Sequence, residues 1–137
     1  MKTWLVDTGP LVALLAAADQ HHAWTVEQLR RAPATVLTCD AVVTEVAFLL
    51  KRAGHDTDPL FGLIEAGFLR SDFELHAEQA AVRDLMRRYR DTPMSFADAC
   101  LVRLCETRSD SCIWTLDRDF TIYRRNRRQT IPLVAPW

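Results

Sequence analysis

The sequence predicts an α/β fold in which a mostly parallel sheet of about four to five strands lies between helices as a three-layer α/β/α sandwich. Short apolar runs of strand length alternate with amphipathic segments of helical length along all 137 residues. Hydrophobic residues make up 49% of the chain and charged residues 26%, which is typical of globular proteins. No linker or repeat divides the sequence, so we expect one domain over residues 1–137.

Five short segments are expected to form the strands. The first, Thr3 to Val6, is apolar and is followed by Asp7 and then by Gly9 and Pro10, which interrupt regular structure. The other four expected strands cover residues 35–38, 68–75, 111–115 and 131–134. Each is separated from the next by helical sequence, which favours parallel pairing.

Six segments are expected to form helices. Pro10 suits the first turn of a helix that reaches Ala18. Asp40 can cap a helix that ends near Arg52, because Gly54 follows as a stop signal. The remaining expected helices cover residues 21–31, 59–66, 76–90 and 95–107.

The charge balance alone does not predict nucleic-acid binding, since the formal net charge is −1. The kind of basic residue is more informative: only Lys2 and Lys51 of the 17 basic residues are lysines. The planar guanidinium group of arginine matches the geometry of a phosphate. A solvated, arginine-rich surface explains the presence of any single arginine equally well. The densest group of arginines lies near the C-terminus and comprises Arg118, Arg124, Arg125, Arg127 and Arg128.

Several classes of protein are disfavoured by the sequence. The four cysteines form no C-x-x-C pair, and no spacing of Cys and His resembles a zinc site. Three of these cysteines lie in apolar segments, where thiols behave as small hydrophobic groups. No apolar run approaches the roughly 18–20 residues that cross a bilayer. We therefore expect a cytoplasmic protein that makes no use of a membrane.

Four carboxylates adjoin apolar segments. Asp7 and Asp117 follow expected strands, whereas Glu45 and Asp98 lie on the apolar faces of expected helices. Ligands of parallel α/β sheets bind at the carboxyl ends of the strands. Buried carboxylates that converge repel one another unless a cation neutralises them, and Mg²⁺ and Mn²⁺ prefer oxygen ligands. The sequence therefore predicts an acidic pocket for a divalent cation.

Each of the four carboxylates also has a simpler structural interpretation. Asp7 could belong to a turn before Gly9, and Glu45 could form an ion pair with Arg52 or another basic residue. Asp98 could form a capping box with Ser95. Asp117 or Asp119 could cap a short turn before Phe120. All four applying together is much less probable than any one of them.

Four motifs in order resemble those of PIN-domain proteins. They are Val6-Asp7-Thr8-Gly9-Pro10-Leu11-Val12-Ala13-Leu14-Leu15, Thr44-Glu45-Val46, Met94-Ser95-Phe96-Ala97-Asp98-Ala99 and Thr115-Leu116-Asp117-Arg118-Asp119-Phe120. Their order and spacing, and the length of the chain, are similar to those of small prokaryotic PIN proteins that act as VapC-type toxins. The resemblance covers essentially the whole chain.

The resemblance implies a Mg²⁺- or Mn²⁺-dependent endoribonuclease that hydrolyses RNA phosphodiester bonds by metal-activated water. It further implies a toxin of a toxin–antitoxin pair, a homodimer, and a small antitoxin protein that blocks the acidic pocket. We expect exposed apolar helix surfaces to form the dimer, with Leu60, Phe61 and Ile64 among them. Such toxins are often basic, so at a net charge of −1 this chain would depend on local arginine clusters to contact RNA.

The site residues that the resemblance implies follow by position. Asp7, Glu45 and Asp98 would be the core metal ligands and catalytic residues. The fourth acidic position falls on Asp117, with Asp119 as the alternative or helper. Supporting hydroxyl groups fall on Thr8 and Ser95, and contacts to the RNA backbone on Arg118, Arg124 and Arg125.

One other class of enzyme and one class of signalling domain are disfavoured, because each needs a residue that this chain lacks. A phosphatase of the haloacid-dehalogenase type needs a second aspartate two residues after Asp7, where this chain has Gly9. A response-receiver domain needs a late lysine, and the only lysines here are Lys2 and Lys51. The remaining alternative is a catalytically silent PIN scaffold that binds RNA or a protein partner without cutting.

Overall fold

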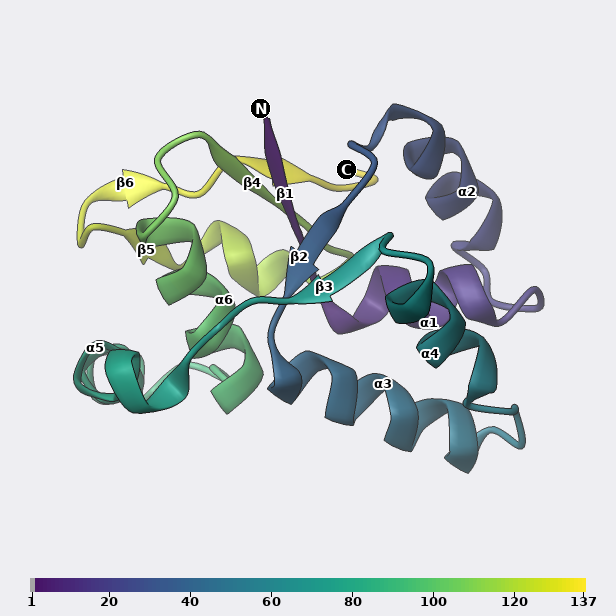
Figure 1. Ribbon diagram of the computed structural model, residues 1–137. Coiled ribbons are helices and arrows are strands. Elements are labelled where there is room, and N and C mark those ends of the chain that lie inside the picture. The colour runs from purple at the N-terminus through teal and green to yellow at the C-terminus, as the bar shows by residue number, and fades with distance from the viewer. Residues whose placement is uncertain (1) are drawn as a thin grey trace.

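The computed structural model describes residues 2–137 and has a five-stranded, fully parallel sheet flanked by helices (Figure 1). The strands of this sheet are β1 (Thr3–Val6), β2 (Val36–Thr38), β3 (Leu69–Ser71), β4 (Ser111–Trp114) and β7 (Leu133–Val134). Their order is β3-β2-β1-β4-β7, so that β1 lies at the centre. The predicted three-layer α/β/α class is therefore confirmed.

Within residues 2–137, six α-helices connect these strands, as the sequence predicted. They are α1 (Thr8–Leu15), α2 (His22–Arg31), α3 (Asp40–Arg52), α4 (Asp58–Glu65), α5 (Leu75–Arg88) and α6 (Phe96–Glu106). The bounds of α3 agree with those expected from the Asp40 and Gly54 signals. The carboxyl ends of β1, β2 and β4 feed directly into α1, α3 and the short 3₁₀ helix η1 (Arg118–Thr121).

Two elements are shorter than expected. Helix α1 was expected to reach Ala18 but ends at Leu15, because a turn closed by the Asp19 N–H on the carbonyl of Ala16 follows it. Strand β3 was expected over residues 68–75 but ends at Ser71, because only Leu69 to Ser71 pair with β2 before α5 begins. In both cases apolar residues continue in the sequence past the end of the regular element.

A two-stranded hairpin near the C-terminus was not predicted. Strand β5 (Arg124–Arg125) pairs antiparallel with β6 (Gln129–Thr130). Its turn places Asn126 and Arg127 at positive φ angles of 49° and 70°. Asparagine tolerates this left-handed region better than most residues, but the flanking strands have no alternating apolar pattern that would have revealed them.

The hydrophobic core lies on both sides of the central strands. Leu5 and Val6 of β1 and Ile113 and Trp114 of β4 are fully buried. The indole of Trp114 packs edge-on against Trp4, with ring centroids 5.6 Å apart. Helix α6 packs against β1 and β4, and it contributes buried apolar side chains along most of its length. The core thereby fixes the edge of the sheet where β1 and β4 end.

The cysteines behave as the sequence suggested. All four are buried and none is in a disulfide. Within residues 2–137, no helix combines the length and the apolar character needed to cross a membrane.

Candidate active site

Asp7 is fixed at the carboxyl edge of the sheet by the pairing of β1 with β4. Its backbone N–H donates to the carbonyl oxygen of Trp114 at 3.0 Å, which continues the ladder one residue past the strand. The hydroxyl of Thr115 donates to Oδ2 of Asp7 at 2.7 Å. Both side chains are buried. Asp7 precedes α1 but its side chain does not cap that helix, so the carboxylate is left facing the edge of the sheet.

Asp98 has the capping role that the sequence left open. The hydroxyl of Ser95 accepts the Asp98 N–H at 3.0 Å, and Oδ2 of Asp98 accepts the Ser95 N–H at 3.2 Å. The buried hydroxyl of Tyr123 donates to the same Oδ2 atom at 3.0 Å. These bonds hold the carboxylate in one orientation. The two bonds that reach the carboxylate, from the Ser95 N–H and the Tyr123 hydroxyl, both engage Oδ2.

Glu45 reaches the same edge from α3. The hydroxyl of Thr8, at the start of α1, donates to Oε2 of Glu45 at 3.1 Å. Glu45 itself is exposed. The ion pair with Arg52 that the sequence left open is not formed, and no other basic side chain of residues 2–137 lies within ion-pair distance of Glu45. The Thr8 contact ties the start of α1 to α3.

Asp117 also has a capping role, at the start of η1. Its Oδ1 atom accepts the N–H of Asp119 at 2.9 Å, and its own N–H donates to the hydroxyl oxygen of Thr115 at 2.9 Å. Thr115 therefore bonds to both Asp7 and Asp117. The half-buried Asp117 side chain points to the shared edge, whereas Asp119 does not line the pocket there.

These side chains line one pocket of about 480 Å³. It brings together all four predicted carboxylates, both predicted hydroxyl residues and one of the three predicted arginines. Its lining residues are Asp7, Thr8, Gly9, Glu45, Pro93, Ser95, Asp98, Leu116, Asp117 and Arg118. Segments from the beginning, middle and end of the chain therefore meet where the parallel strands end.

Negative charge in the pocket is poorly compensated. The pKa of Asp7 is raised from 3.8 to about 7, chiefly by burial. The nearby carboxylates of Asp98 and Asp117 add to this rise, and the hydrogen bond from Thr115 opposes it. Burial also raises the pKa of Asp98. Carboxylic acids whose pKa values are raised in this way gain from a nearby cation, because the cation stabilises the ionised form.

The donor set fits a hard divalent cation, although it does not form a complete cage. Among residues 2–137, no group of three or more Asp, Glu, His or Cys side chains is arranged so that it could enclose a metal ion by itself. Mg²⁺ ordinarily binds through one or two carboxylates and keeps several waters. The buried carboxylates of Asp7 and Asp98, which line the same pocket, are suited to that mode of binding.

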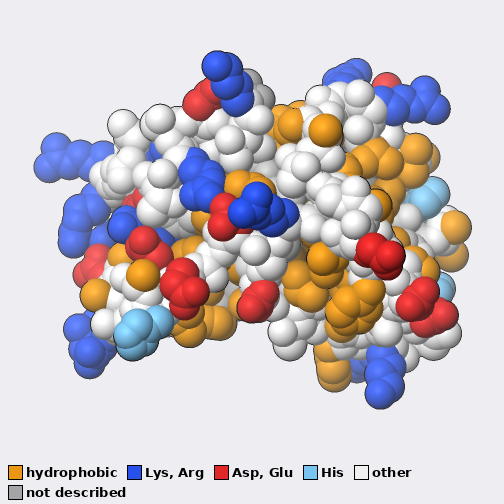
Figure 2. Space-filling view, in the orientation of Figure 1, with side chains coloured by type: hydrophobic (Ala, Val, Ile, Leu, Met, Phe, Trp, Pro, Cys, Tyr) orange, Lys and Arg blue, Asp and Glu red, His pale blue; other side chains and the backbone are white. Residues whose placement is uncertain are grey.

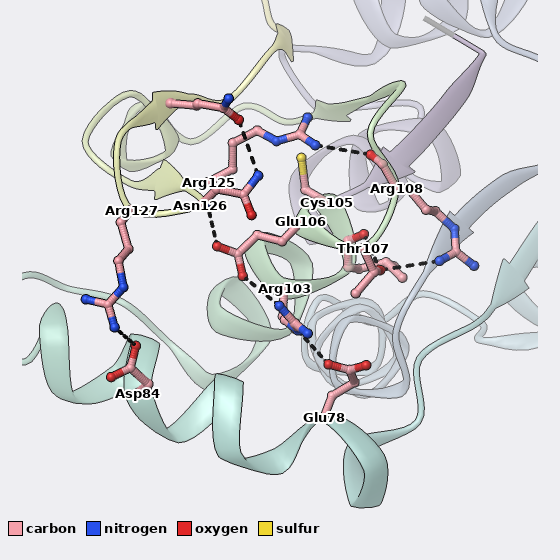
Figure 3. A network of polar contacts seen from close by, with 12 residues as sticks. Glu78, Asp84, Arg103, Cys105, Glu106, Thr107, Arg108, Arg125, Asn126 and Arg127 are labelled. Carbon is pink, nitrogen blue, oxygen red and sulfur yellow. Dashed lines mark hydrogen bonds and ion pairs between the residues drawn. The ribbon is translucent and has the colours of Figure 1, made fainter.

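The structure does not bring Arg124 and Arg125 to the pocket. The buried guanidinium of Arg125 donates to the carbonyl oxygens of Ser109 and Arg108, as Figure 3 shows for the Arg108 contact. Nη1 of Arg124 donates to the carbonyl oxygen of Thr121 at 2.7 Å. Both side chains donate to main-chain carbonyls of this fold, so of the three arginines predicted to bind RNA only Arg118 lines the pocket.

Two residues with a role in the site were missed by the sequence analysis. Thr115 stood at the end of an expected strand, two residues before Asp117, and its place at the start of the fourth acidic motif was the available signal. Tyr123 had no such signal. It reaches Asp98 only because η1 turns the chain back toward α6, where its ring packs edge-on against Phe120 and Tyr89.

Comparison with known proteins matches residues 4–126 to the family model described as the PIN domain. Among solved structures, the chain is similar to the crystal structure of Mycobacterium tuberculosis VapC20, described as a sarcin–ricin-loop-cleaving toxin. That likeness has a TM-score of 0.76 at 22% sequence identity and covers 95% of this chain and 100% of the other. No curated protein matches. At this identity the structural likeness shows a shared fold.

The raised pKa of Asp7 predicts how stability depends on pH in the metal-free protein. Its pKa is about 7 in the fold and near 3.8 in the unfolded chain, so the carboxyl destabilises the fold fully above pH 7 and not at all below its unfolded pKa. Asp7→Asn should therefore raise the free energy of unfolding near pH 8, by an upper bound of about 4 kcal/mol, and by much less near pH 5.

Urea denaturation of both proteins in EDTA at the two pH values measures this difference. Asp58→Asn, at an exposed position on α4, is the matched control and should show no such dependence. A stabilisation by Asp7→Asn that is equal at the two pH values would contradict the burial of an ionisable Asp7.

The placement of Arg125 predicts a structural role for this arginine. Arg125→Met should lower the free energy of unfolding by about 2–4 kcal/mol, because it removes the guanidinium donor from the carbonyl oxygens of Ser109 and Arg108 and leaves that of Arg108 with only the Ser111 hydroxyl. Arg128→Met, at an exposed position nearby, removes the same charge and should change stability by less than about 0.5 kcal/mol. Equal, small effects in thermal and urea unfolding would show that Arg125 is not needed for the fold.

Proposed function

The chain belongs to the PIN-domain family, and on this premise we propose that it is a metal-dependent endoribonuclease acting as the toxin of a toxin–antitoxin pair. The observation that carries the proposal is the meeting of four carboxylates, from distant parts of the sequence, in one pocket at the carboxyl edge of the parallel sheet. The likeness to VapC20, a toxin that cleaves the sarcin–ricin loop, supports RNA as the substrate class.

Asp7 and Asp98 are the residues that would hold Mg²⁺ or Mn²⁺, with Glu45 and Asp117 completing the acidic pocket. A divalent cation bound there would supply positive charge and Lewis acidity to the scissile phosphodiester. Thr115 and Tyr123 keep Asp7 and Asp98 in fixed orientations by donating hydrogen bonds to them. The hydroxyls of Thr8 and Ser95 line the pocket and can orient a water or a phosphate oxygen.

Proton release accompanies cation binding in this proposal. The pKa of Asp7 is raised to about 7 by burial, so near neutral pH this carboxyl carries a proton part of the time. A cation binds the ionised form, and the affinity should therefore rise with pH through the neutral range. Asp119 lies outside the pocket and takes no direct part, which favours Asp117 as the fourth acidic residue.

The partners in this proposal are an antitoxin protein that covers the acidic pocket and a second copy of the chain. The expected dimer surface needs one correction, because Leu60 is fully buried in the core. Phe61 and Ile64 on α4 are exposed, as are Phe48 and Leu49 on α3. Figure 2 shows hydrophobic side chains gathered over α3 and α4 on the visible face. We propose this face, rather than one that includes Leu60, for the homodimer.

Cleavage of RNA tests the proposed activity. The protein should cut end-labelled total or transfer RNA into discrete products with Mg²⁺ or Mn²⁺ and not with EDTA. Asp7→Asn and Asp98→Asn should each reduce the rate by about 100-fold or more, because each removes a carboxylate proposed to hold the cation. Asp117→Asn should have a much larger effect than Asp119→Asn.

The control for this assay is Asp58→Asn, which removes a carboxylate from the exposed surface of α4. It should cleave as fast as the unchanged protein. Full activity of purified, folded Asp98→Asn would refute the assignment of the pocket. RNA binding without cleavage under either metal would instead support a silent PIN scaffold.

The homodimer is tested by sedimentation velocity at tens of micromolar. The unchanged protein should sediment as a dimer, and Phe61→Glu should shift it toward monomer because a charge would be buried in the interface. Gln79→Glu, on the exposed part of α5, places the same charge elsewhere and should leave the dimer intact. A monomer at all these concentrations would exclude the dimer.

A further inference from the structure

Trp137 lies beside the acidic pocket although nothing in the four acidic motifs involves it. Strand β7 pairs parallel with β4, so the carboxyl end of β7 reaches the same edge of the sheet as Asp7 and Asp117. The N–H of Thr115 donates to the carbonyl oxygen of Val134 at 3.0 Å, which fixes the chain only three residues before Trp137. The position of Trp137 is therefore set by the same pairing that builds the pocket.

Arg118 connects this tryptophan to the pocket. Its guanidinium carbon lies over the indole of Trp137, 4.7 Å from the ring centroid, within the range of a cation–π contact. Arg118 also lines the acidic pocket and is its only basic lining residue in the described part of the chain. No carboxylate of residues 2–137 forms an ion pair with it. The guanidinium is held by an aromatic ring, and its charge remains available.

The indole itself remains accessible. Trp137 is 42% exposed, although it is large and aromatic and its contact with Arg118 covers part of the ring. Proteins that bind single-stranded nucleic acid combine exposed aromatic rings, on which bases stack, with cations that meet the phosphates. An exposed indole with an unpaired arginine against it has both parts of such a subsite.

We infer that Trp137 and Arg118 form a nucleotide subsite next to the acidic pocket, in which the indole stacks on an RNA base and Arg118 contacts the adjoining phosphate. This inference rests on the proposed endoribonuclease function and deepens it. Four carboxylates repel the RNA backbone, so a cation at the rim offsets part of that repulsion. The base that stacks on Trp137 belongs to a nucleotide beside the scissile phosphate, and stacking there holds the strand in register.

A purely structural role for Trp137 makes a different prediction from a base-stacking role. If the indole only anchors Arg118 and the end of β7, its loss weakens the binding of RNA with and without bases equally. If the indole stacks on a base, its loss matters only when that base is present. An RNA strand with abasic nucleotides keeps the phosphates and removes the stacking partner, and it separates the two roles.

The test measures the binding of fluorescein-labelled single-stranded oligoadenylate of roughly twelve nucleotides, and of an abasic strand of the same length, by fluorescence anisotropy. The protein carries Asp7→Asn to prevent cleavage. Trp137→Ala should weaken oligoadenylate binding about tenfold and leave binding of the abasic strand unchanged, while Trp137→Tyr should restore most of the affinity. Arg118→Ala should weaken both strands alike and lower the salt dependence by about one phosphate contact.

Met86→Ala is the matched control, because it removes an exposed apolar side chain from α5, outside the acidic pocket and the proposed dimer face, and should not alter either affinity. Equal losses for both strands with Trp137→Ala, or no loss for either, would overturn the subsite. Thermal unfolding of each variant identifies any loss that comes from the fold. Absence of binding to either strand by the parent protein would also count against the subsite.

Cleavage measured in parallel separates this inference from the proposed function. If the unchanged protein cuts RNA with Mg²⁺ and Trp137→Ala cuts with the same KM and kcat, the subsite is wrong and the nuclease stands. If oligoadenylate binding depends on Trp137 but no RNA is cut with either metal, the subsite stands and the nuclease assignment fails. The expected result is a raised KM in Trp137→Ala with kcat little changed.

Discussion

The parallel pairing of β1 with β4 is the constraint on which the rest of the site depends. It joins the two central strands in register from Thr3 with Ser111 to Val6 with Trp114, and so ends both strands at the same edge. Asp7 and Asp117 then follow at that edge, and the hydroxyl of Thr115 bonds to both. Helices α3 and α6 can add Glu45 and Asp98 because their own N-termini lie at the same edge. A change of register here would separate every group in the pocket.

This arrangement makes ionisation of the carboxylates in the pocket unfavourable. Asp7 is buried among other carboxylates, and its pKa is raised to about 7 mainly because burial removes water from the ionised form. The fold offsets this with hydrogen bonds from Thr115 to Asp7 and from Tyr123 to Asp98, but the pocket contains one arginine against four carboxylates. A binding site that is short of positive charge favours a cation, and the exposed Arg118 is the remaining group that can meet a polyanion.

The sequence predicted the fold class and the meeting of the carboxylates because both follow from local patterns. Alternating strand and helix signals determine a parallel sheet, and parallel strands must end at one edge. The helix-capping role that was an alternative for Asp98 is compatible with a place in the pocket. Asp98 caps α6 through Oδ2 and still lines the pocket. Tyr123 could not have been foreseen, since its contact with Asp98 depends on how η1 packs. The arginines near the C-terminus were equally ambiguous, because sequence clustering does not show that Arg125 is buried against main-chain carbonyls.

Calorimetric titration of Mn²⁺ into the metal-free protein, in buffers with different enthalpies of ionisation, tests the central claim most directly. It reports both whether the pocket binds a cation and how many protons leave when it does. The account predicts binding near neutral pH with release of a fraction of a proton that falls toward zero as the pH rises above the pKa of Asp7. Asp7→Asn should abolish that release and weaken binding. No binding, or equal binding and proton release in Asp7→Asn, would contradict the claim that this buried carboxylate is part of a cation site.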